Sequence, residues 1–84
     1  MHYVYVLLSK KDNKLYIGKT GDLRRRFKEH NDGLNLSTKN RVPFVLVYYE
    51  AYKSSRDAAR REVRLKKFKN SYTELRKRII ESCA

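Results

Sequence analysis

The chain has 84 residues, which is enough for one small domain and excludes a two-domain enzyme. Its 21 lysines and arginines outnumber nine acidic residues, and a formal net charge of +12 favours a polyanionic partner. The longest apolar run, Val42 to Tyr49, is far shorter than the roughly 20 residues that cross a bilayer. We therefore expect a single domain over residues 1–84 that binds nucleic acid and no membrane.

The start of the chain predicts an intracellular protein, and its single cysteine predicts no disulfide. Met1 is followed directly by strand-like residues, with no basic segment or cleavage site of a signal peptide, so we expect a cytoplasmic location. The single cysteine, Cys83, has no partner for an internal disulfide or a Cys/His metal cluster. We interpret it as an incidental thiol.

Two short runs rich in β-branched and aromatic residues, Tyr3–Leu8 and Leu15–Gly18, predict β-strands. Asp12-Asn13 between them predicts a two-residue turn, which places Leu8 opposite Ile17. The sequence therefore predicts an antiparallel hairpin in this register.

In this register Tyr5 and Tyr16 lie on the same face of the hairpin, whereas a shift by one residue would separate them. Strand tyrosines usually fill a core. As a general base, a tyrosine needs a nearby cation to lower its pKa from about 10, and Lys19 or a metal-bound water could provide that charge.

The next element is a helix predicted over Asp22–Asn31, with Thr20 as its N-cap. Leu23 and Phe27, four residues apart, form its buried stripe. A polar loop and the strand Phe44–Glu50 follow. Because that strand is apolar on both faces, we expect it in the centre of the sheet.

Two helices complete the chain. Ser54 and Asp57 form a capping box for a helix over Ser55–Lys69, and Ser71 precedes a last helix over Tyr72–Ser82. The order β-β-α-β-α-α predicts an α+β fold in which a three-stranded antiparallel sheet is flanked by helices.

Glu62 is the most informative single residue because it falls on the same helical arc as Ala58 and Leu65. A carboxylate at the edge of a core either pairs with a basic side chain or binds a hard divalent cation. The position of Glu62 alone does not distinguish an ion pair from a metal ligand.

Arg26 and His30 lie four residues apart and point to the same side of the predicted first helix. A guanidinium suits phosphate oxygens, and an imidazole accepts a proton near neutral pH. The alternative is a solvated basic face.

Together, these residues resemble the GIY-YIG nuclease superfamily. Tyr16-Ile17-Gly18 matches the second half of its signature, and Tyr5 keeps the final tyrosine of the first half. Arg26 and His30 occupy the positions of two active-site residues on the family's helix. The resemblance extends over about residues 3–68 and includes two segments similar to small standalone members, Ser37–Glu50 and Arg61–Lys66.

The resemblance implies an endonuclease that hydrolyses phosphodiester bonds of nucleic acid with the help of one Mg²⁺ or Mn²⁺ ion. DNA is the expected substrate. Glu62 would hold the metal, and Arg26 would neutralise charge in the transition state. The base that activates water would be Tyr5, Tyr16 or His30, and this choice stays open. DNA repair or recombination is the implied setting.

Further basic residues predict contacts with the phosphate backbone. The candidates are Lys19, Arg24, Arg25, Lys28 and Lys39. Backbone contacts carry little base information, so we expect weak sequence specificity. If about five phosphates are neutralised, log K should fall with log salt at a slope of about −4 to −5.

Two departures from the family pattern bear on substrate choice. Asn70 lies out of register for the asparagine that follows the metal-binding glutamate in several members, and Phe68–Ser71 replaces a tryptophan-containing segment. A catalytically silent nucleic-acid-binding module fits the charge equally well. An accessory subunit whose protein partner supplies substrate specificity fits the small size.

Overall fold

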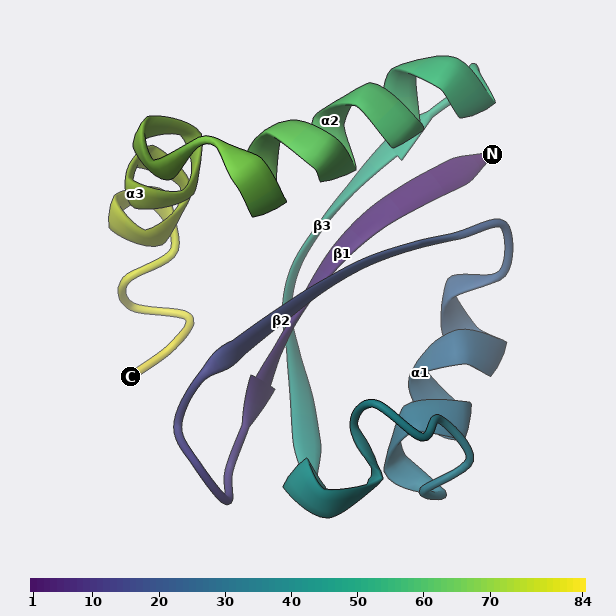
Figure 1. Ribbon diagram of the computed structural model, residues 1–84, viewed down its shortest axis with the longest axis vertical. Helices are drawn as coiled ribbons and strands as arrows, with labels where there is room; N and C mark the ends of the chain where they lie inside the picture. The colour runs from purple at the N-terminus through teal and green to yellow at the C-terminus, as the bar shows by residue number, and fades with distance from the viewer.

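The computed structural model describes residues 1–84 and has the expected α+β architecture, with the element order β-β-α-β-α-α (Figure 1). Three antiparallel strands form one sheet in the order β2-β1-β3. The strands are β1 (His2–Ser9), β2 (Leu15–Thr20) and β3 (Phe44–Tyr52). The helices are α1 (Leu23–Asn31), α2 (Ser55–Lys67) and α3 (Lys69–Arg78).

The central strand is β1, and the prediction that the third strand is central was wrong. β1 pairs with a neighbour on each side, and its residues 4–9 are all buried. β3 has only one neighbour, and Val45 and Tyr49 are 42% and 53% exposed. The apolar run of β3 therefore provides an edge strand with side chains left in solvent.

The first hairpin is displaced by two residues from the predicted register, because Leu8 pairs with Leu15 and not with Ile17. The two-residue turn was also wrong, since the strands are joined by residues 10–14. Arg41 donates from Nε to the Asp12 carboxylate over 2.7 Å and so holds this longer loop in place. A displacement of two residues preserves the faces of both strands. The predicted common face of Tyr5 and Tyr16 is therefore confirmed.

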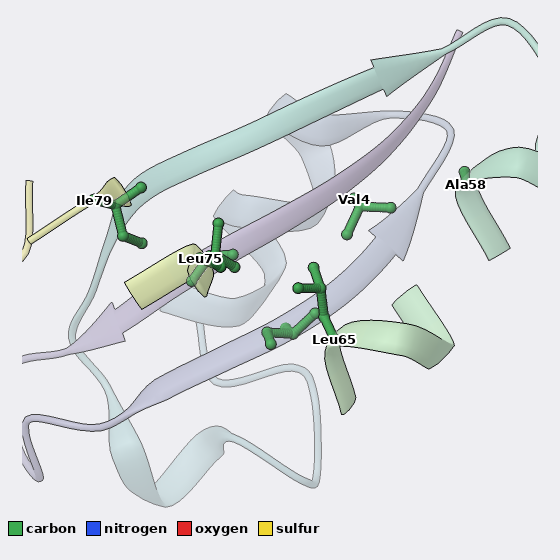
Figure 2. Close-up of a cluster of buried hydrophobic side chains, with 7 residues drawn as sticks. Val4, Ala58, Leu65, Leu75 and Ile79 are labelled. Atoms are coloured by element: carbon green, nitrogen blue, oxygen red, sulfur yellow. The ribbon is translucent and has the colours of Figure 1, made fainter. Parts of the chain in front are cut away.

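The sheet separates α1 from α2 and α3 (Figure 1). On the α2 and α3 side, seven side chains form an aliphatic core that Figure 2 shows in close-up: Val4, Val6, Ile17, Ala58, Leu65, Leu75 and Ile79. On the α1 side, a smaller cluster contains Tyr5, Leu7 and Phe44. The two faces therefore differ in size and in polarity.

Predicted boundaries of all three helices required correction, and α2 ends at Lys67 rather than at Lys69. Asp22 caps α1, because its carboxylate accepts from the Arg25 N–H over 3.1 Å, whereas Thr20 accepts from the Asp22 N–H. α3 begins at Lys69 and ends at Arg78, because Phe68 alone adopts an extended conformation between α2 and α3. The Ser54 cap of α2 is confirmed. The longest of these helices remains too short and too polar to span a bilayer.

Candidate active site

A chain of three buried polar side chains lies on the α1 face of the sheet. The Tyr5 hydroxyl is hydrogen-bonded to His30 Nε2 at 2.8 Å, and His30 Nδ1 is hydrogen-bonded to Thr38 Oγ1 at 2.9 Å. Tyr5 is 1% exposed, and the other two residues are fully buried. A neutral imidazole has one donor and one acceptor nitrogen, so both of its partners can be satisfied at once.

The local fold explains why His30 occupies this position. It lies in the last turn of α1, whose end is attached to the sheet by the next residue, Asn31. The Asn31 side chain accepts from the Phe44 N–H over 2.7 Å and donates to the Phe44 carbonyl over 3.1 Å. This pair of bonds joins α1 to β3 and holds the imidazole above the sheet.

The second tyrosine and its glycine complete the aromatic part of the site. The Tyr16 ring centroid lies 5.0 Å from that of His30 and 6.5 Å from that of Tyr5. Gly18 pairs with Tyr5 across the hairpin, and a Cβ at Gly18 would clash with the Tyr5 hydroxyl and ring. Glycine is therefore required here so that the tyrosine can lie flat against β2.

Burial keeps Tyr5 protonated and His30 neutral near pH 7. Burial raises the pKa of Tyr5, although the neighbouring Arg26 guanidinium opposes that change. Burial and then the positive charge of Arg26 lower the pKa of His30, with Glu29 opposing. The pKa of Arg26 is raised by Tyr5 first and also by Glu29, whose carboxylate lies 3.3 Å away. Arg26 therefore stays charged beside the tyrosine.

Glu62 approaches this site from α2. Its side chain is 22% exposed, and its Oε2 lies 3.2 Å from Lys66 Nζ. Lys66 Nζ in turn lies 5.9 Å from the centroid of the Tyr16 ring. These two contacts place the Glu62 carboxylate near the Tyr16 side of the site, and its negative charge is a minor contribution to the raised pKa of Tyr5, after burial.

The other predicted contact residues lie around this site and not in it. Lys19 pairs with Val4, on the sheet face opposite Tyr16, and its Nζ donates to Ser55 Oγ over 3.4 Å. The remaining basic candidates, on and after α1, are exposed: Arg24, Arg25, Lys28 and Lys39. Two of them form ion pairs within α1, Arg25 with Glu29 at 3.9 Å and Lys28 with Asp32 at 2.6 Å.

Comparison with known proteins shows which family the chain belongs to. The family model described as the GIY-YIG catalytic domain matches residues 1–77. The chain belongs to the GIY-YIG family. This family consists generally of nucleases that act on nucleic acid, and the match includes every residue of the site described above.

Small proteins similar to this GIY-YIG domain occur in several organisms. It is 44% identical to a UPF0213 protein of Clostridium perfringens over 80% of this chain and 72% of that protein. It is 46% identical to a UPF0213 protein of Staphylococcus haemolyticus over 80% of this chain and 82% of that protein. The solution NMR structure of a UPF0213 protein from Bacillus halodurans is 39% identical, with a TM-score of 0.56, covering 88% of this chain and 79% of that chain.

The donor set of this GIY-YIG domain fits a metal site that contains one protein carboxylate. No group of three or more acidic, His or Cys side chains lies together anywhere in the chain. Mg²⁺ in phosphoryl-transfer sites often uses one or two carboxylates, with waters and substrate phosphates as its other ligands. Glu62 is a partly exposed oxygen donor of this kind, and its contact with Lys66 is a single ion pair within one helix.

Sequence reasoning missed two residues of the site. Lys66 follows Glu62 by four residues, and this Glu-Lys spacing is a recognisable helical pair. Thr38 has no such signal, because it is one hydroxyl residue in a polar loop, and only the tertiary structure brings it to His30. Thr38 could therefore not have been found from the sequence.

Proposed function

We propose that this GIY-YIG domain is a metal-dependent endonuclease that hydrolyses phosphodiester bonds of nucleic acid, with DNA as its expected substrate. The observation that supports this function best is the buried chain Tyr5–His30–Thr38 with Arg26 and Glu62 beside it. Buried polar groups cost stability unless every one is bonded, and apolar side chains would stabilise a core more simply. A module that only binds phosphates has no need of a carboxylate near them.

Tyr16 is the proposed base that takes the proton of the attacking water. Tyr5 and His30 are almost completely buried, whereas Tyr16 is only partly buried and reachable by solvent. The raised pKa of Tyr5 keeps its proton on the hydroxyl, which suits a hydrogen-bond donor better than a base. Tyr5 and His30 then act as positioning residues that hold the Tyr16 ring from one side.

Arg26 and Glu62 are the proposed partners of the scissile phosphate. The Arg26 side chain is 35% exposed, and its planar fork can bind phosphate oxygens as negative charge develops on them. Glu62 would hold one Mg²⁺ or Mn²⁺ ion once Lys66 releases it. Such an ion supplies Lewis-acid stabilisation of the phosphate and of the leaving oxygen.

The exposed basic residues support cutting with little sequence preference. Arg24, Arg25, Lys28 and Lys39 present charges that recognise phosphates and carry no base information. Cleavage of this kind suits DNA repair or recombination, in which structure matters more than sequence.

The test is cleavage of labelled nucleic acids by wild type and Glu62→Gln, with Mg²⁺, Mn²⁺ or EDTA. The panel contains a duplex, a single strand, a nick, a flap and a four-way junction. Glu74→Gln is the matched control, because Glu74 also forms an ion pair with a lysine of its own helix but is 75% exposed. We expect metal-dependent cutting that falls more than about 100-fold in Glu62→Gln.

Three results would contradict the proposal. Equal cutting by Glu62→Gln and wild type would show that Glu62 takes no part in the reaction. Cutting in the presence of EDTA would show that the reaction needs no metal ion. Binding of every substrate without cutting any would identify a catalytically silent nucleic-acid-binding module.

A further inference from the structure

A second feature of the α1 face is an open groove of about 500 Å³ over β1 and β3. Its walls are mostly apolar and aromatic: Tyr3, Leu23, Phe27, Leu46 and Tyr49, with Arg24 at the same groove. The catalytic residues proposed above do not line it. The groove is therefore distinct from the candidate active site, although it shares a helix and a sheet face with it.

Two of the lining tyrosines come from neighbouring strands, Tyr3 from β1 and Tyr49 from β3. The Tyr3 and Tyr49 ring centroids lie 6.0 Å apart at an interplanar angle of 66°. Tyr49 is 53% exposed, so about half of this residue stays open to solvent. An aromatic pair that stays open to solvent beside an arginine provides stacking surface and positive charge at one place.

We propose that this groove is a binding subsite for one unpaired nucleobase of the bound nucleic-acid strand. The base would stack on Tyr49 beside Tyr3, and Arg24 would contact the adjoining phosphate. A base inside a duplex already has neighbours on both faces, so only an unpaired or displaced base can enter. This subsite rests on the proposed function for its partner, a nucleic acid, and specifies which part of that partner is recognised.

The arrangement of charge on α1 connects the groove with the active site. At 100° per residue, Arg24 and Arg26 lie on opposite flanks of the half-buried stripe formed by Leu23 and Phe27. Arg25 lies on the outer surface between them and is exposed. A strand that crosses α1 would therefore place one base in the groove and a nearby phosphate beside Arg26.

Charge also argues against other occupants. Two copies of a chain with a net charge of +12 repel each other, which disfavours a second copy on this face. Asp22 is the single acidic residue that lines the groove, and its Oδ1 accepts from the Arg25 N–H as the helix cap. The surroundings of the groove therefore favour a ligand that combines a flat apolar ring with negative charge.

The test uses a labelled single strand of ten deoxynucleotides and its fully abasic analogue, with binding measured by fluorescence anisotropy in EDTA. We expect wild type to bind the strand with bases at least about tenfold more tightly than the abasic strand. In Tyr49→Leu this preference should fall to less than about twofold, whereas Tyr49→Phe should keep it. Phe68→Leu is the matched control, because Phe68 is also exposed, at 58%, but lies between α2 and α3.

A preference for bases that survives in Tyr49→Leu would overturn the subsite, as would an equal loss in Phe68→Leu. Equal binding of both strands by wild type would overturn it without any variant. A blunt duplex serves as the second control, because its affinity should be the same for wild type and Tyr49→Leu. Since EDTA prevents metal-dependent cutting, the subsite can be confirmed even where the Glu62 test fails, and the reverse also holds.

Discussion

The two faces of the sheet use burial in different ways. The α2 and α3 face buries aliphatic side chains almost exclusively, whereas the α1 face buries the Tyr5–His30–Thr38 chain next to Leu7 and Phe44. Aliphatic burial stabilises without regard to direction, while a hydrogen-bonded polar chain stabilises only when its geometry is satisfied. The α2 and α3 face therefore stabilises the fold, whereas the α1 face gives up part of that stability to hold polar groups in position.

Even on the aliphatic side, polar groups are fully paired where they approach the core. Arg61 donates to both Glu50 oxygens at 3.0 to 3.2 Å, and Tyr48 and Tyr52 donate to the same carboxylate. Burial followed by the Glu50 bond raises the pKa of Tyr52 to about 12. Burial alone would raise the pKa of Glu50, but Arg61 and the two tyrosines hold it below its ordinary value. This cluster links β3 to α2.

The largest expected loss of stability is on the aliphatic face. Leu65→Ala should lower the free energy of unfolding by about 2–5 kcal/mol, because Leu65 is 2% exposed and its removal leaves a cavity. Val63→Ala in the same helix is the control, since Val63 is 44% exposed and should cost much less. Urea unfolding measures both. Cleavage per folded molecule should stay near the wild-type rate, and a loss comparable with that of Glu62→Gln would break the division between the faces.

A smaller loss of stability, with a large loss of function, is expected at Gly18. Gly18→Ala should cost about 1–3 kcal/mol, because the new methyl group clashes with a tyrosine that is buried and bonded to His30. It should also move Tyr5 and so reduce cleavage. Gly21→Ala is the control, since no atom lies within 4 Å of a Cβ there. Equal unfolding midpoints for the two variants would show that the Tyr5 side chain can move away from the new methyl group without a loss of stability.

The smallest expected effect is a pH dependence of stability that originates at His30. The pKa of this imidazole is lower in the folded state than its ordinary value of 6.5, mainly through burial. The unfolded chain therefore binds the proton more readily, and stability falls as the pH decreases below about 6.5 towards the folded-state pKa. Urea unfolding between pH 5 and 8 should show this decrease in wild type and less of it in His30→Gln. Identical profiles would contradict a neutral buried His30.

Much of the fold was accessible from local pattern. Strand composition, the Ser54 cap and the Leu23 and Phe27 stripe predicted the element order, and the pleat put Tyr5 and Tyr16 on one face even in a wrong register. The errors arose where distant contacts decide. The Asp12–Arg41 pair sets the hairpin loop, and pairing on both sides makes β1 the central strand although β3 has the longer apolar run.

The candidate active site also has features that follow from the sequence and features that depend on distant contacts. The sequence by itself determined the types and spacing of Tyr5, Tyr16, Arg26, His30 and Glu62, since strand and helix periodicities are local properties of the backbone. Only the tertiary structure decided that Thr38 bonds His30, and that Tyr5 is buried while Tyr16 is partly open. The physical reason is that burial and hydrogen-bond partners depend on which segments pack together, and no local pattern encodes that choice.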